Sequence, residues 1–130
     1  MSVKVRFAWE TDTPQIRALL ADADLMVPGT PYDRFPSSTW VATEDEHVVG
    51  VLMAVLGYPL SVVLNIAVEV SRRHQGIGRA LLETFEAHLI GLGYPTWLAC
   101  TDITRASSEY IQAWPGVQSL GTASIWGKVL

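Results

Sequence analysis

The chain has 130 residues, of which 49% are hydrophobic, and carries a formal net charge of −4 at pH 7. This length fits one domain with a sizeable core, so we expect a single domain over residues 1–130. Nine Lys and Arg against thirteen Asp and Glu argue against nucleic acid as the main partner. The same balance is compatible with a cationic substrate.

The single cysteine, Cys100, excludes an internal disulfide bond and fits a reducing compartment. We interpret its thiol as an inert core residue. No apolar segment reaches the ~20 residues of a membrane span, and the N-terminus lacks the layout of a signal peptide. The sequence therefore predicts a cytoplasmic protein without a membrane partner.

The first forty residues predict a strand, a helix and a loop. Residues 3–7 alternate between apolar and basic side chains, as in a half-buried strand. A helix follows, with Thr11 or Asp12 as its N-cap and Pro14 in its first turn. Its apolar stripe consists of Ile16, Leu19, Leu20 and Ala23.

Residues 26–38 then lose all periodicity around three prolines and a glycine, which predicts a loop. Loops of this length are often functional, but a packed loop that covers the core fits equally well.

Three strands are expected next. Residues 38–44 and 47–56 form an antiparallel hairpin around a turn at Asp45 and Glu46, and the second arm is apolar enough for a central strand. Residues 62–70 are rich in β-branched side chains and predict a third, buried strand. Farther along, we expect a short strand at 96–101, a short helix at 103–113 and a terminal hairpin of residues 117–120 and 124–130.

The segment between the third strand and the next helix changes character abruptly. Residues 71–75 are polar and basic, Gly76 and Gly78 follow, and from Ile77 the apolar positions recur at helical spacing up to Leu92. A helix start carries unpaired N–H groups and attracts phosphate, while glycines let the phosphate approach and Arg72, Arg73 and Arg79 add positive charge. The alternative is a glycine-softened connection without a ligand. Neither the Rossmann fingerprint nor the P-loop pattern is present.

Residues 73–78, Arg-His-Gln-Gly-Ile-Gly, resemble the Arg/Gln-x-x-Gly-x-Gly/Ala signature of the GNAT superfamily of acyl-CoA-dependent N-acetyltransferases. The flanks at 65–68 and 79–82 and the order of predicted elements are similar too. The resemblance implies an α/β (α+β) fold with a mixed, mainly antiparallel central sheet and flanking helices. It also implies that the strands before and after the signature helix start parallel and splay apart, so that the acyl-pantetheine arm enters the gap.

The resemblance implies acetyl-CoA, with coenzyme A as its product, as the acyl donor, and no metal. The pyrophosphate would lie on the backbone of residues 73–79, and the pantetheine arm would pair with residues 66–68. The implied cofactor-binding residues are Ile66, Ala67, Val68, Arg73, His74, Gln75, Gly76, Ile77, Gly78 and Arg79. The loop at 26–38 corresponds to the region that shapes the acceptor pocket, which makes Tyr32 and Asp33 candidate substrate-binding residues.

Catalysis needs a polarised carbonyl, a proton for the thiolate and a neutral amine. By resemblance, the backbone N–H of Val68 polarises the carbonyl. The family pattern Asn-x-x-Ala-x-x-Leu-Tyr-x-x-x-Gly-Phe is matched only in part, by Ala106 and Tyr110, with Ile103 in place of the asparagine. Tyr110, with an ordinary pKa of about 10, is the candidate acid. The alternative is a helix residue whose ring packs under the terminal hairpin.

A general base is not evident. The positions where family members often carry a glutamate are Val62 and Leu98, which cannot accept a proton. Glu69, our candidate, or Asp102 could act through water, whereas His74 belongs to the phosphate turn. At pH 7 a lysine amine is only ~0.04% neutral and an α-amine ~14% neutral. The missing base therefore favours an acceptor amine of depressed pKa.

The sequence predicts an enzyme that moves an acetyl group from acetyl-CoA to a primary amine of a small molecule or a peptide or protein N-terminus, by direct attack in a ternary complex. The alternative is a catalytically weak or inactive CoA-binding domain that acts as a sensor or structural partner. The C-terminal segment with Trp126, Val129 and Leu130 could pair across a homodimer or be buried within one subunit.

Overall fold

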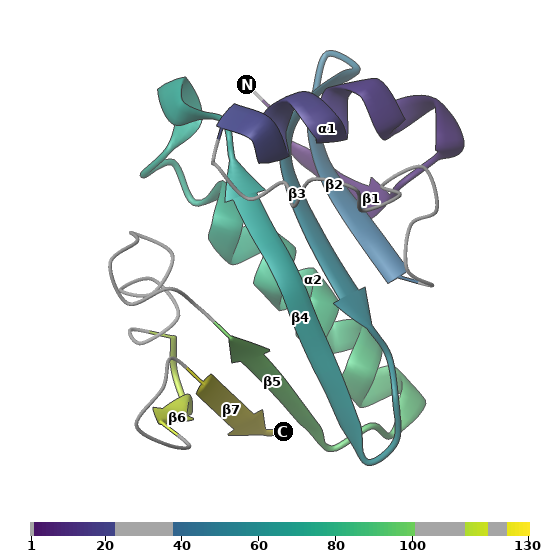
Figure 1. The fold of residues 1–130 in the computed structure, drawn as a ribbon, viewed down its shortest axis with the longest axis vertical. Helices are drawn as coiled ribbons and strands as arrows, with labels where there is room; N and C mark the ends of the chain where they lie inside the picture. Colours follow the sequence, from purple (N-terminus) through teal and green to yellow (C-terminus); the bar gives the residue numbers. More distant parts are fainter. Residues whose placement is uncertain (1, 23–37, 101–113, 120–124) are drawn as a thin grey trace.

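The computed structural model describes residues 2–22, 38–100, 114–119 and 125–130 (Figure 1). Predictions on the other residues lie outside this description. They concern the loop with Tyr32 and Asp33, the helix expected at 103–113 with Tyr110, and Asp102.

The described strands form one mixed sheet in the order β1-β2-β3-β4-β5-β7-β6. All neighbours are antiparallel except β4 and β5, which are parallel. The mixed, mainly antiparallel sheet predicted above is therefore confirmed. The strands are β1 (Lys4–Phe7), β2 (Ser38–Glu44), β3 (His47–Val55), β4 (Leu60–Val68), β5 (Thr96–Cys100), β6 (Gln118–Ser119) and β7 (Ile125–Val129).

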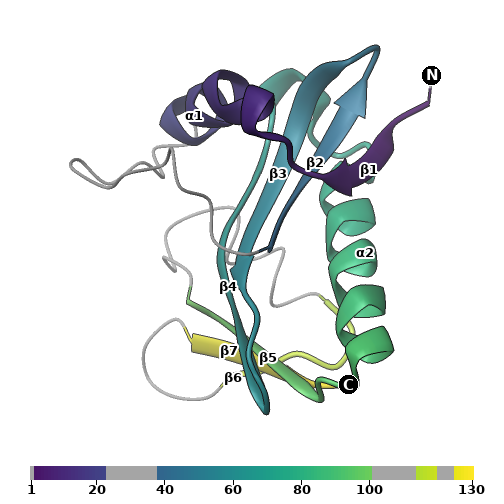
Figure 2. The same ribbon diagram turned by 90° about the vertical axis from the view of Figure 1, so that its right-hand side faces the viewer.

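In the described part of the chain, two α-helices cover opposite faces of the sheet (Figure 2). Helix α1 (Thr13–Asp22) packs Ile16, Leu19 and Leu20 on one face, against side chains of β2, β3 and β4. Helix α2 (Ile77–Leu92) packs on the other face, where Leu81, Phe85 and Leu89 meet the indoles of Trp40 and Trp97. Two short 3₁₀ turns, η1 (Glu10–Asp12) and η2 (Val70–Arg72), precede these helices. No helix in the described part of the chain is long and apolar enough to cross a membrane.

The hairpin of β2 and β3 lies where the sequence predicts it. Its two turn residues, Asp45 and Glu46, have φ angles of 50° and 66°. Positive φ at both positions is typical of the two-residue turns that match the twist of antiparallel strands. The hairpin therefore projects Glu44 and His47, the residues that flank the turn, from the same end of the sheet.

The strand predicted at residues 62–70 is displaced by two residues. Strand β4 begins at Leu60 because Leu60 and Ser61 pair with Thr96 and Trp97 of β5, a partnership that an apolar run cannot reveal. It ends at Val68, and Val70 belongs to η2, where its side chain is 64% exposed. The apolar stripe of α2 likewise ends one turn early, because Leu92 is exposed.

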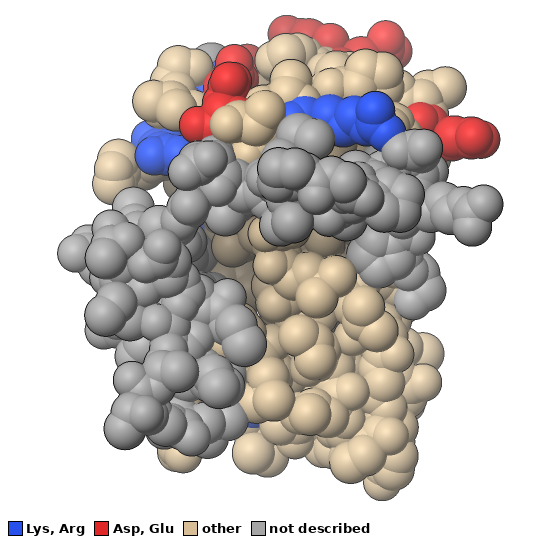
Figure 3. All heavy atoms as spheres, viewed as in Figure 1, with Lys and Arg blue, Asp and Glu red and all other residues tan. Residues whose placement is uncertain are grey.

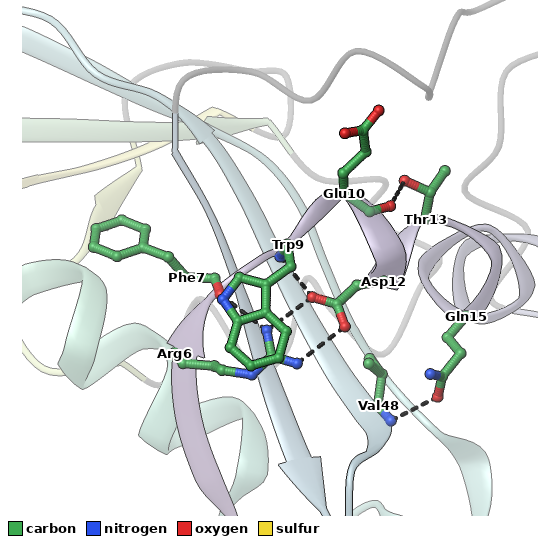
Figure 4. Close-up of polar contacts among 8 residues, drawn as sticks. All are labelled: Arg6, Phe7, Trp9, Glu10, Asp12, Thr13, Gln15 and Val48. Carbon is green, nitrogen blue, oxygen red and sulfur yellow. Dashed lines mark hydrogen bonds and ion pairs between the residues drawn. The ribbon is translucent and has the colours of Figure 1, made fainter.

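The start of α1 also differs from the prediction. The helix begins at Thr13, and Asp12 turns its carboxylate back toward β1 instead of capping it (Figure 4). The carboxylate accepts hydrogen bonds from the backbone N–H of Trp9 at 2.6 Å and from the Arg6 guanidinium at 2.8 and 3.0 Å. The same guanidinium stacks 3.7 Å from the centre of the Trp9 ring. Asp12 therefore ties the start of α1 to the edge strand β1.

A buried carboxylate holds the second half of α2 in place. Glu86, 8% exposed, accepts hydrogen bonds from the indole N–H groups of Trp97 at 2.9 Å and Trp114 at 3.0 Å. The ammonium of Lys128 lies 2.8 Å from one of its oxygens and 3.0 Å from the other. One side chain of α2 thus connects the helix to β5, to β7 and to the segment before β6.

Candidate functional site

Strands β4 and β5 pair over only four residues. Residues 60–63 face residues 96–99, and β4 then continues to Val68 while β5 ends at Cys100. Figure 1 shows the two strands starting side by side and diverging toward their carboxyl ends. The splay that the family resemblance implies is therefore confirmed.

An irregularity in β4 coincides with the point of separation. Against β3, the register steps from Asn65 opposite Met53 to Val63 opposite Ala54, which leaves Leu64 without a partner. A bulge of this kind bends a strand and increases its twist. Beyond Leu64, no strand in the described part of the chain pairs with the β5 side of β4. Among the described residues, the backbone of 65–68 is thus an open edge that can pair with another extended group.

This open edge leads into the predicted phosphate turn. The N–H of Glu69 still bonds to the carbonyl of Val49 at 2.9 Å, and η2 then coils the chain before His74 and Gly76 adopt φ angles of 63° and 81°. The first backbone bond of α2 runs from Ala80 N–H to the carbonyl of Gly76 at 3.0 Å. Gly76 is the N-cap residue and supplies no side-chain cap. The N–H groups of Ile77 and Gly78 therefore lack acceptors within the helix, the arrangement that binds anions.

Gly50, which the sequence analysis did not single out, lets α2 approach the sheet at this turn. A Cβ atom on Gly50 would lie 2.9 Å from Cγ2 of Ile77 and 3.2 Å from Cδ1 of Leu81. Only glycine fits beneath the first turn of the helix without a shift of these side chains. An isolated glycine within an apolar strand is the sequence signal that could have indicated this close approach.

The basic residues of the turn are arranged in different ways. Arg73 is exposed and its Nε donates to the carbonyl of Val68 at 3.4 Å. Arg79 is also exposed and its Nε lies 2.8 Å from Glu83, one helical turn away. Arg72 instead points to the hairpin, where its guanidinium contacts Glu44. Its Nε also donates to the side-chain oxygen of Gln75 at 3.1 Å.

The remaining predicted cofactor residues fall along one path. Ile66 and Val68 pack against the core under α2, whereas Ala67 is buried on the α1 face. His74 and Gln75 are exposed in the turn, and Ile77 is buried against the sheet. The structure thus joins the two predicted groups, residues 66–68 and 73–79, into one stretch that runs from the open edge of β4 to the start of α2.

Glu69, the candidate base, lies at the turn end of this path. Its carboxylate is 38% exposed and lies 3.5 Å from Nε2 of His47. It follows the bulge at Leu64 by five residues, roughly 16 Å along an extended strand. Val62 and Leu98 are direct neighbours across the start of the splay and are both half-buried. The catalytic role of Glu69 stays a prediction.

A mixed sheet whose parallel pair parts beside a glycine turn and a helix start defines the acyl-CoA N-acyltransferase fold. The chain belongs to the Acetyltransferase (GNAT) family, which it matches over residues 6–112. The match spans most of the residues that the structure describes and reaches from β1 beyond β5.

Solved structures with the same fold cover nearly the whole chain. One is the ribosomal-protein-S18-alanine N-acetyltransferase from Escherichia coli, with a TM-score of 0.82, 17% identity, and coverage of 98% of this chain and 94% of that one. A GNAT family acetyltransferase from Staphylococcus aureus Mu50 gives a TM-score of 0.85 at 11% identity, with 99% of both chains covered. The PaiA N-acetyltransferase from Thermoplasma acidophilum, in complex with coenzyme A, gives 0.83 at 12% identity and covers both chains completely. None of the curated proteins matches the chain.

Proposed function

We propose that this chain binds acetyl-CoA along β4 and the start of α2 and transfers the acetyl group to a primary amine of a small molecule or a peptide N-terminus. The observation that carries the proposal is the continuity of the open edge of residues 65–68 with the start of α2, where Gly76 supplies no side-chain cap to the N–H groups of Ile77 and Gly78. An extended amide-containing arm fits the first part, and a pyrophosphate fits the second. The coenzyme A complex of the Thermoplasma acetyltransferase supports this use of the shared fold.

The chemistry follows from where such a donor would lie. With the pyrophosphate on the turn, the pantetheine arm runs back along β4 and brings the thioester toward the bulge at Leu64. An N–H group of β4 at that end is then better placed to polarise the carbonyl than the N–H of Val68, which lies next to the turn. We retain Tyr110 as the proposed acid, Glu69 as a base that acts through water, and Tyr32 and Asp33 as acceptor contacts.

The half-buried pair of Val62 and Leu98 bears on the acceptor. A carboxylate at either position would lie where the strands part, but both side chains are aliphatic. We therefore propose an acceptor amine of depressed pKa, such as an α-amino group, which reacts without strong base assistance. The same pair favours the second candidate function, a CoA-binding domain with little or no turnover.

Thermal unfolding with and without ligands tests the proposal. A ligand at 100 times its Kd stabilises the fold by about 2.7 kcal/mol, so acetyl-CoA and desulfo-CoA should each raise Tm by several degrees, and ATP should not. Release of free thiol from acetyl-CoA is then measured with an α-amine and with an ε-amine of the same peptide. Faster release with the α-amine supports the enzyme proposal, whereas a Tm shift without thiol release supports the second candidate. If neither CoA species shifts Tm, the proposed function is wrong.

A further inference from the structure

The ion pair between Glu44 and Arg72 connects two segments that are distant in the sequence. Glu44 is the last residue of β2, next to the hairpin turn, and Arg72 is the last residue of η2. Their side chains are only 16% and 17% exposed, in contrast to the exposed side chains of Arg73 and Arg79. Arg72 is thus the one arginine of the described turn that points inward, toward the sheet.

The same guanidinium also contacts the turn itself. Its Nε donates to Gln75, which lies between the two residues with left-handed backbone, His74 and Gly76. His74 is not a glycine, so its φ of 63° is an unfavourable backbone conformation unless other contacts hold it. Arg72 therefore connects the fixed end of β2 to the strained part of the phosphate turn.

The hairpin contacts this segment at two further points. The N–H of Glu69 donates to the carbonyl of Val49 at 2.9 Å, and the carboxylate of Glu69 lies 3.5 Å from His47. Gly76 provides no cap that could fix the start of α2 by itself. In the absence of a bound anion, the hairpin of β2 and β3 therefore supplies the described ion pairs that position the turn, beside the long bond from Arg73 to the carbonyl of Val68 in β4.

We propose that Glu44 and Arg72 form a brace that holds the turn in its anion-binding conformation before the ligand arrives, with Arg72 as a positioning residue and not a phosphate ligand. This inference rests on the proposed function for the identity of the ligand. The carboxylate of Glu44 already compensates the charge of Arg72, so the pair adds little net attraction for a pyrophosphate. Its contribution is preorganisation, because a turn that is already ordered loses less entropy when it binds.

The two roles of Arg72 predict opposite effects of Glu44→Gln. If the pair is a brace, Glu44→Gln removes the charged partner of Arg72 and the affinity for coenzyme A falls. The fall is about tenfold if one ordered charge-assisted contact of ~1.4 kcal/mol is lost. If Arg72 instead binds the phosphate directly, Glu44→Gln removes the carboxylate that competes for its guanidinium, and coenzyme A should bind more tightly. Arg72→Met should weaken binding in either case, and the exchanged pair Glu44→Arg with Arg72→Glu should restore most of it only if the pair is a brace.

The experiment is titration calorimetry of the full chain with coenzyme A and with pantetheine, which lacks the pyrophosphate. Asp45→Asn is the matched control, because it removes one negative charge from the same hairpin at an exposed position. The brace predicts weaker coenzyme A binding for Glu44→Gln, unchanged pantetheine binding, and wild-type behaviour for Asp45→Asn. Tighter coenzyme A binding by Glu44→Gln, or equal losses for both ligands, overturns it.

Hydrogen exchange of the backbone amides without ligand separates this inference from the proposed function. The brace predicts that residues 70–77 exchange faster in Glu44→Gln than in the wild type, while the amides of β5 do not change. Equal exchange in both proteins overturns the brace even if coenzyme A binds. Faster exchange in a protein that does not bind coenzyme A supports the brace and contradicts the proposed function.

Discussion

Charged side chains have different roles at the two ends of α2. At the first turn, the N–H groups of Ile77 and Gly78 have no acceptor within the helix, and the charged pair of Glu44 with Arg72 connects the preceding turn to the hairpin. In the second half, Glu86 is buried and its carboxylate accepts from two indoles and an ammonium. The first end is open to a ligand, and the second is closed by the protein itself.

The difference indicates how one helix can offer a site for a ligand at its start and also stabilise the fold. Unpaired N–H groups at a helix start contribute nothing to stability until an anion reaches them. The free energy that keeps α2 on the sheet must therefore come from other contacts, which are the apolar face with Phe85 and Leu89 and the polar network of Glu86. Substitutions at the two ends should accordingly separate stability from ligand binding.

The network of Glu86 should give the largest loss of stability. Glu86→Ala leaves the Lys128 ammonium and two indole N–H groups without their acceptor in a poorly hydrated region, which should lower the free energy of unfolding by about 3 kcal/mol. Urea unfolding measures this loss. Glu83→Gln, on the exposed side of the same helix, should change stability by less than ~0.5 kcal/mol. Under conditions where Glu86→Ala is folded, its coenzyme A affinity should equal that of the wild type, and a matched loss of affinity would contradict the separation.

Gly50→Ala should instead disturb the start of α2, at the opposite end of the helix from Glu86. The new methyl group overlaps Ile77 and approaches Leu81, so the first turn of α2 must move away from β3, at a cost of about 2 kcal/mol. Because the same turn carries the unpaired N–H groups, coenzyme A binding should weaken as well, which calorimetry can measure.

Gly91→Ala provides the control for this change, because it is the same substitution in the last turn of α2, at a position where a Cβ meets no atom within 4 Å. Alanine favours the helical backbone there, so this variant should be more stable by up to ~1 kcal/mol, with unchanged coenzyme A binding. If Gly50→Ala binds coenzyme A as tightly as Gly91→Ala, the start of α2 does not hold the ligand.

Local patterns in the sequence predict those elements that local forces determine. The hairpin of β2 and β3 and the start of α2 at Ile77 follow from alternation, turn residues and helical spacing, and the structure confirms them. The start of β4 is not predictable in this way, because it depends on pairing with β5, which follows only after a helix.

The candidate site shows the same limit. The glycines and arginines of residues 73–79 predict from sequence alone a turn suited to an anion, and the structure places them before and at the start of α2. The inward orientation of Arg72 depends on Glu44, which lies 28 positions earlier, and no local pattern connects the two. Glu86 carries a weak signal, since it falls between Phe85 and Leu89 on the buried side of α2, where a charge needs a partner.

The smallest effect concerns acid stability at the open end of α2. The hydrogen bond from Arg72, followed by its charge, lowers the pKa of Glu44 below the ordinary value of 4.5. A carboxyl group whose pKa is lowered on folding stabilises the protein above its unfolded pKa, and this contribution is lost as the pH falls through the folded pKa. The wild type should therefore exceed Glu44→Gln in stability at pH 7, and the difference should shrink as the pH falls below the unfolded pKa of Glu44 and through its folded pKa. The pKa of Asp12 is also lowered, by Arg6, but Asp12 titrates in both proteins and its contribution cancels in the comparison.

Because the pair of Glu44 and Arg72 lies near the surface, the difference in stability should be smaller than the effects of Glu86→Ala and Gly50→Ala. Urea unfolding of both proteins at pH 7 and at successively lower pH measures it, and a difference that does not shrink on acidification would assign the effect of Glu44 to packing and not to its charge.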